Sequence, residues 1–172
     1  MLLNMDEEEH VKEVYARFGL AMYCAQLLEH DVVNALVIMD LIPSRRHTMN
    51  AAEQWGALID AFMDERFELT MGRLFESLRS VTLVPFELDS RLRAALKKRN
   101  WLAHGFFRDR TEQFMTPAGR DSMLAEIEEI TALFTAADRQ LGEIVEPLRR
   151  KAGLTDEMIA KAYAENMGRL GW

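Results

Sequence analysis

Apolar positions recur along this chain with the three- and four-residue spacing of amphipathic α-helices. The N-terminal part gives the clearest case, because its apolar and small residues fall on one stripe of a helical wheel. The members of this stripe are Val11, Val14, Phe18, Ala21, Ala25, Leu28, Val32, Ala35 and Met39. An acidic run at residues 6–9 favours a helix N-terminus there, and Pro43 predicts the end of the helix. The pattern predicts a first helix of roughly 35 residues, against an average of about 11–12.

The pattern after this helix predicts a polar loop at residues 45–50 and further helical segments at residues 51–80. Apolar spacing recurs with Trp55, Leu58, Ile59 and Phe62, and again with Met71, Leu74, Phe75 and Leu78. Thr70 precedes the second group and is a residue type that caps helices. The pattern leaves open whether residues 51–80 form one kinked helix or two. Residues 81–85, which end in proline, predict an extended connector.

The C-terminal half predicts two more main helices and a short one. Asp89 or Ser90 is expected to begin a helix that ends near Gly105. A long helix is expected after Pro117 and should be closed by Gly153, while Thr155 should cap a last short helix. The β-branched run lies at residues 81–85, and the sequence predicts no second strand with which it could form a sheet. We therefore predict a single all-α domain over residues 1–172, an up-and-down helical bundle with a long first helix.

Composition narrows the class of protein further. With 172 residues, 49% of them hydrophobic, the chain can bury a substantial core. The single cysteine, Cys24, excludes an intramolecular disulfide framework and a cysteine-based zinc site, so we expect a reducing, cytoplasmic location. The most apolar run, residues 32–42, is interrupted by Asn34 and Asp40 and is too short to span a bilayer. We expect no membrane association.

Charge is distributed unevenly along the chain. The net charge of −7 and the pI near 5.2 exclude a uniformly cationic nucleic-acid binder. Residues 88–110 nevertheless hold seven basic against two acidic residues, a net +5, so the rest of the chain carries −12. The basic residues are Arg91, Arg93, Lys97, Lys98, Arg99, Arg108 and Arg110. Such a segment can bind a polyanion locally, and it can equally be the solvated face of a helix.

Arg99 is the most informative residue in this basic segment. On a helical wheel it falls inside the apolar stripe of Leu92, Ala95 and Leu102, where an unpaired guanidinium is costly. Arg99 therefore needs a carboxylate, a partner chain or a bound anion. His104 follows Asn100 by four residues and can share its face, but it lies about 140° around the helix from Arg99. The two converge only through a local distortion or across an interface. The alternative is that Arg99 bonds to backbone and His104 caps the helix end.

The segment Arg99-Asn100-Trp101-Leu102-Ala103-His104 resembles the signature of the HEPN superfamily (higher eukaryotes and prokaryotes nucleotide-binding). The resemblance implies an all-α bundle that is usually a homodimer, with two motifs facing each other in a composite cleft. It further implies a metal-independent endoribonuclease of toxin or defence type, with an antitoxin protein as a partner in some cases, or a non-catalytic nucleotide-binding module.

The resemblance also implies roles for individual residues. His104 would act as general base or acid for attack of a ribose 2′-OH on phosphorus, and Arg99 would stabilise the phosphorane. Asn100 would orient the histidine or the phosphate. We expect the substrate-binding residues to be Arg91, Arg93, Lys97, Lys98, Trp101 and Arg108. No cofactor or metal is expected, since His10, His30 and His47 lack metal-site spacing. The alternative is a non-catalytic helical module that dimerises or docks to a partner, with Arg99 in a structural ion pair.

Overall fold

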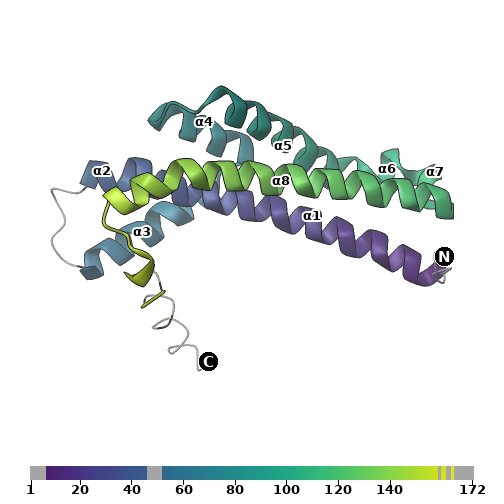
Figure 1. Cartoon of the computed structure of the whole chain (residues 1–172), viewed down its shortest axis with the longest axis horizontal. Helices are drawn as coiled ribbons and strands as arrows, with labels where there is room; N and C mark the ends of the chain where they lie inside the picture. The colour runs from purple at the N-terminus through teal and green to yellow at the C-terminus, as the bar shows by residue number, and fades with distance from the viewer. Residues whose placement is uncertain (1–6, 46–51, 159, 162–163, 165–172) are drawn as a thin grey trace.

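The computed structural model describes residues 7–45, 52–158, 160–161 and 164, and all regular secondary structure over these residues is helical (Figure 1). The elements are α1 (Glu7–Leu36), η1 (Val37–Leu41), α2 (Ile42–Arg45), α3 (Ala52–Phe67), α4 (Met71–Val81), α5 (Phe86–His104), α6 (Phe106–Asp109), α7 (Thr111–Phe114) and α8 (Pro117–Lys151). The all-α prediction is confirmed for this part of the chain.

The predicted long first helix is present and extends slightly beyond its expected end. Three glutamates occupy the first turn of α1, and helical backbone continues through the π-helical turn η1 and α2 to Arg45. Pro43 therefore lies inside the helical run. In a regular α-helix its ring would clash with the carbonyl of Met39. The wider π turn immediately before Pro43 relieves this clash, so the proline does not end the helix.

Residues 51–80 form two helices, which answers the question that the pattern left open. The break lies at residues 68–70, and Thr70 caps α4 by accepting a hydrogen bond from the Arg73 N–H at 3.4 Å. Residues 82–85 form the predicted extended connector. The predicted start of the next helix at Asp89 or Ser90 was wrong, because α5 begins at Phe86, directly after Pro85. The fixed φ of proline suits the position before a first helical turn. Most of the predicted loop at residues 45–50 lies outside the described residues.

The turn between α7 and α8 is tight. The Thr116 side chain caps α8 by accepting from the Gly119 N–H at 3.1 Å, and Pro117 occupies the first helical position. A Cβ atom on Gly119 would lie 2.1 Å from the Gln113 carbonyl oxygen, so only glycine fits. At the other end of α8, Gly153 has a φ of +85°, as expected of a helix-closing glycine. Thr155 accepts from the Met158 N–H, as predicted.

The core lies between the two longest helices. α1 and α8 lie side by side over most of the length of the molecule and run in the same direction, while α5 runs in the opposite direction (Figure 1). The buried residues at the α1–α8 contact are Val14, Ala21, Ala25, Leu28 and Val32 on α1, and Met123, Ile127, Ile130, Phe134, Ala137 and Leu141 on α8. Helices α4 and α5 cover this pair with Leu74, Phe75, Leu88 and Leu92.

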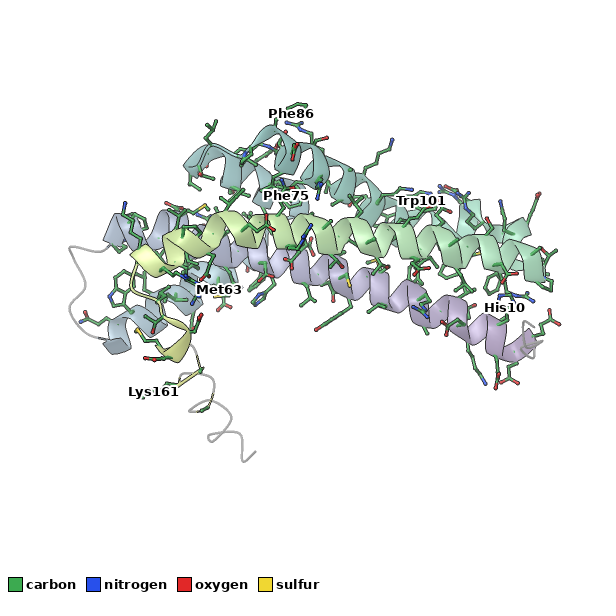
Figure 2. The ribbon with its side chains drawn as sticks, in the orientation of Figure 1. His10, Met63, Phe75, Phe86, Trp101 and Lys161 are labelled. Atoms are coloured by element: carbon green, nitrogen blue, oxygen red, sulfur yellow. The ribbon has the colours of Figure 1, made fainter. Side chains whose placement is uncertain are left out.

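One cation is buried at the end of the bundle where α1 and α8 begin. The Arg120 side chain is 2% exposed, and its Nη1 donates to the Phe114 carbonyl at 2.9 Å. Its Nη2 donates to Glu7 at 3.4 Å, while its Nε has no acceptor. His10 is buried beside it, with Nε2 3.1 Å from Asp121 (Figure 2). Arg120 thus connects α1, α7 and α8, which the sequence pattern did not predict.

Two carboxyl groups meet near the other end of the α1–α8 contact. Asp138 of α8 lies within hydrogen-bonding reach of Asp31 of α1, and no donor among the described residues reaches the buried Asp138 Oδ1. Burial, and then the Asp31 carboxylate, raise the pKa of Asp138 to about 6. The folded state therefore holds this proton more tightly than the unfolded chain does.

The Asp138→Asn variant should be more stable than the wild type at pH 7 and equally stable at pH 4. The folded pKa lies above the ordinary value, so wild-type stability is lost as the pH rises from about 4 through about 6. Because Asp138 is partly exposed to solvent, we expect a gain of roughly 1 kcal/mol at pH 7. Urea unfolding of both proteins between pH 4 and 8 measures the difference in their free energies of unfolding. A difference that does not change with pH would contradict the assignment.

Candidate functional site

Arg99 projects from the core-facing side of α5 and is held by an acidic residue of α1. Its Nη2 donates to Glu29 Oε1 at 3.3 Å, and the two side chains are 30% and 19% exposed, respectively. Its Nη1 donates to the side-chain oxygen of Asn100, also at 3.3 Å. Of the three partners that the sequence analysis considered, the carboxylate is the one that the structure provides. The guanidinium is therefore neutralised, but it is not sealed from solvent.

Glu29 is the site residue that the sequence analysis missed. Burial raises the pKa of Glu29, and the Arg99 guanidinium opposes this by lowering it. A signal was available in the sequence, because Glu29 follows Leu28 and precedes Val32 at the edge of the apolar stripe of α1. A lone acid at the edge of one apolar stripe and a lone base inside another are electrostatically complementary, which favours packing the two stripes together.

Asn100 and His104 lie on the solvent side of α5, one helical turn apart. Both are exposed, and no hydrogen bond joins them. Within the described part of the chain, the His104 imidazole makes no hydrogen bond or ion pair. The prediction that Arg99 and His104 do not converge on a regular helix is confirmed, since Arg99 faces α1 and His104 faces solvent. A single chain does not assemble the three residues around one point.

Trp101 packs within its own chain. Its ring contacts Phe106 edge to face at a centroid distance of 5.1 Å, and its Nε1 donates to Asp109 at 2.9 Å. Lys98 and Arg110 lie 5.0 and 5.1 Å from the centre of the ring. The indole hydrogen bond, and then the Arg108 guanidinium, lower the pKa of Asp109. Trp101 thereby fastens α6 to the end of α5 that bears His104 (Figure 2).

Most cations of the basic segment have acidic partners. Three pairs have short N–O distances: Arg93 with Asp89 (2.7 Å), Arg110 with Glu126 (2.8 Å) and Arg108 with Asp109 (3.0 Å). Lys98 lies farther from Glu126, at 3.7 Å. Among the described residues, Arg91 and Lys97 have no ion-pair partner. The free positive charge is therefore smaller than the sequence count suggests, and Lys97 shares the exposed face of Asn100 and His104.

The other residues weighed from sequence lie away from this site. His30 is exposed, with Nδ1 3.0 Å from the Asn34 side chain, and its ring stacks on Phe67. Cys24 is partly buried, and His47 lies outside the described residues. Four cavities, of about 540, 450, 320 and 230 Å³, are lined by described residues, and none of these four includes Arg99, Asn100 or His104.

Comparison of this chain with models of protein families, with characterised proteins and with solved structures finds no match. Among the described helices, none combines the length and the apolar character that a bilayer crossing requires. A functional assignment for this protein therefore depends on the motif and on the geometry around it.

Proposed function

We propose that this chain is an HEPN-like, metal-independent endoribonuclease of toxin or defence type with an up-and-down bundle fold. The observation that carries the proposal is the exposed His104 imidazole, which lies on one face of α5 with Asn100 and Lys97. An exposed imidazole that makes no bonds within the described part of the chain is available for proton transfer. The opposite directions of α5 and its neighbours α1 and α8 also suit such a bundle (Figure 1).

Each residue of the motif has a role that suits its chemistry. His104 would accept the proton of a ribose 2′-OH as that oxygen attacks the adjacent phosphorus. Arg99 would donate to the phosphorane oxygens, since a guanidinium stays charged and binds phosphate in a fork. Asn100, which already bonds to Arg99, would hold that guanidinium toward the substrate. The P–O5′ bond would break as the 2′-oxygen bonds to phosphorus, and the leaving 5′-oxygen would take a proton from water, so the products would be a 2′,3′-cyclic phosphate and a free 5′-hydroxyl.

A homodimer is part of this proposal, because Arg99 and His104 of one chain point in different directions. Pairing across a two-fold axis would let the motifs of two chains form one cleft. The chain also offers an apolar surface for self-association. Leu20, Tyr23 and Leu27 are exposed on α1, on the side that faces away from the core. An antitoxin protein is the other partner that the resemblance suggests.

The test is cleavage of a labelled RNA by the purified protein with EDTA present. We expect fragments that end in 2′,3′-cyclic phosphate, and no cleavage where the ribose at the scissile position is 2′-deoxy. Analytical ultracentrifugation in the same buffer measures the oligomeric state. Cleavage that needs an added metal, or that persists on 2′-deoxy substrate, would contradict the mechanism, while no cleavage by the dimer favours the second candidate.

The second candidate function is a non-catalytic helical module that dimerises, binds nucleotide or docks to a partner. The Arg99–Glu29 ion pair favours it, because this contact gives Arg99 a structural role within one chain. Under this alternative His104 has no role in catalysis, and the exposed side of α1 is the surface that binds the partner. The two candidates differ in what the loss of Arg99 does.

Arg99→Ala should lower the free energy of unfolding by about 1–2 kcal/mol and the Tm by roughly 3–6 °C, because Glu29 is left half-buried and without its cation. In the Arg99→Ala/Glu29→Gln double variant, part of this loss should be recovered, since the unpaired charge is removed. Thermal unfolding measures both. Under the nuclease proposal, Glu29→Gln alone keeps cleavage and both Arg99→Ala variants lose it. Cleavage by Arg99→Ala at the parental rate would leave Arg99 only its structural role.

A further inference from the structure

The largest of the four cavities lies far from the Arg99 motif. It measures about 540 Å³ and lies between the C-terminal part of α1 with its π turn, α3 and the C-terminal half of α8. Its walls are mainly apolar and include Ile38, Ile59, Met63, Leu141, Val145 and Leu154. Figure 2 labels Met63 on α3, the helix that contacts α1 and the π turn η1. The volume and the apolar lining are those of cavities that bind small molecules.

One wall of this cavity carries two acidic side chains. Asp31 and Asp138 lie side by side there, and Asn34 donates to Asp31 at 3.0 Å. Among the described residues, none donates a hydrogen bond to the buried Asp138 Oδ1, and no cation lowers the pKa of Asp138. Two arginines also border the cavity: Arg149, which is paired with Glu146 at 2.7 Å, and Arg139, which is exposed and does not shift the pKa of Asp138. A pair of carboxyl groups in an apolar wall is stabilised most by a hydrogen-bond donor that carries positive charge, because it offsets the repulsion between the two acids as well as the cost of burial.

We propose that this cavity binds a small organic cation, an amine with an apolar body. Its ammonium group would donate to Asp138 and Asp31, and its hydrocarbon part would contact Ile59, Met63 and Leu141. A metal ion does not suit the site, because no group of three metal-ligating side chains comes together in the described part of the chain. The cation must therefore bring its own apolar surface.

The π turn η1 borders the same cavity. Val37 and Ile38, at the start of the turn, both line the cavity. A π turn disturbs the regular hydrogen bonding of a helix and shifts the side chains that follow, and such turns occur frequently at binding sites. Here it lies between the carboxyl pair and Pro43, so it shapes the end of the cavity nearest α2.

The test compares amines with alcohols of equal length. Isothermal titration calorimetry of the full chain at pH 7.5 would use n-alkylamines from butyl to octyl, phenethylamine and the matching alcohols. These ligands have sizes that a cavity of this volume can hold. We expect saturable binding in which the best amine binds at least about tenfold more tightly than its alcohol, a difference of about 1.4 kcal/mol. Equal affinities, or no saturable binding across the whole series, would overturn the proposal.

Variants locate the binding at this cavity. Asp138→Asn should reduce the preference for amine over alcohol to about twofold or less, and Met63→Trp, which fills the cavity, should remove binding of both. Glu143→Gln is the matched control, because Glu143 is an exposed acid on the same helix outside the cavity. If Glu143→Gln lowers the preference as much as Asp138→Asn does, the amine responds to surface charge alone and the assigned site is wrong. Circular dichroism establishes that each variant is folded.

Discussion

RNA cleavage by the His104→Ala variant should be about 10²–10⁴-fold slower than by the wild type, because the group that moves the proton is lost. The fold should be unaffected, since the His104 side chain is exposed and bonds to nothing within the described chain. We expect the free energy of unfolding to change by less than about 0.5 kcal/mol. Single-turnover cleavage of a labelled RNA and urea unfolding, carried out on the same preparation, measure the two quantities.

The matched control for this experiment is His30→Ala. His30 is also an exposed histidine, but it lies on α1, where it contacts Asn34 and Phe67. Its replacement should leave cleavage at the parental rate. Loss of cleavage in both variants would indicate a general effect of removing a surface histidine. Parental cleavage by His104→Ala would remove His104 from the mechanism and leave the helical module as the better assignment.

Local rules predicted most of the fold because they act within a few residues. The predicted threonine caps at Thr70 and Thr155 and the glycine at Gly153 mark helix ends in the structure, and the apolar spacing predicted the buried sides of α1 and α8. The errors also have local causes. The sequence pattern predicted that a helix begins at Asp89 or Ser90, but the helix already begins after Pro85.

The short helices α6 and α7 were not predicted, because four residues are too few to show a periodic pattern. They are positioned by tertiary contacts instead. Phe106 and Phe107 both pack against Phe18, and Phe114 packs against Tyr15. Contacts of this kind join residues far apart in the chain, and nothing in the local sequence specifies their partners.

The same limit applies to the site. Position on a helical wheel predicted that Arg99 needs a partner, but the identity of the partner depends on how α1 and α5 pack. The uneven charge was visible in the sequence, whereas its neutralisation by Glu126 depends on the proximity of α8 to α5. The sequence thus predicts that a charged residue such as Arg99 requires a partner, and only the tertiary structure shows which residue that partner is.

Arg120→Ala should have the largest effect on stability among the substitutions considered, a loss of about 3 kcal/mol, which corresponds to roughly 6–12 °C in Tm. The change removes a large buried side chain and leaves the Phe114 carbonyl without its donor. Arg139→Ala is the matched control, because Arg139 is an exposed arginine of the same helix. It should change stability by less than about 0.5 kcal/mol. Equal losses in the two variants would contradict a structural role for Arg120.

Arg120→Met separates the two causes of this loss. Methionine keeps most of the volume, so packing is largely retained, and it also removes the guanidinium Nε that has no acceptor. Only the bonds to Phe114 and Glu7 are lost, and the expected cost is therefore about 1 kcal/mol. Because the Phe114 carbonyl belongs to α7, hydrogen exchange should become faster in α7 in both variants. If Met costs as much as Ala, the hydrogen bonds of Arg120, and not its volume, hold α7 against α1 and α8.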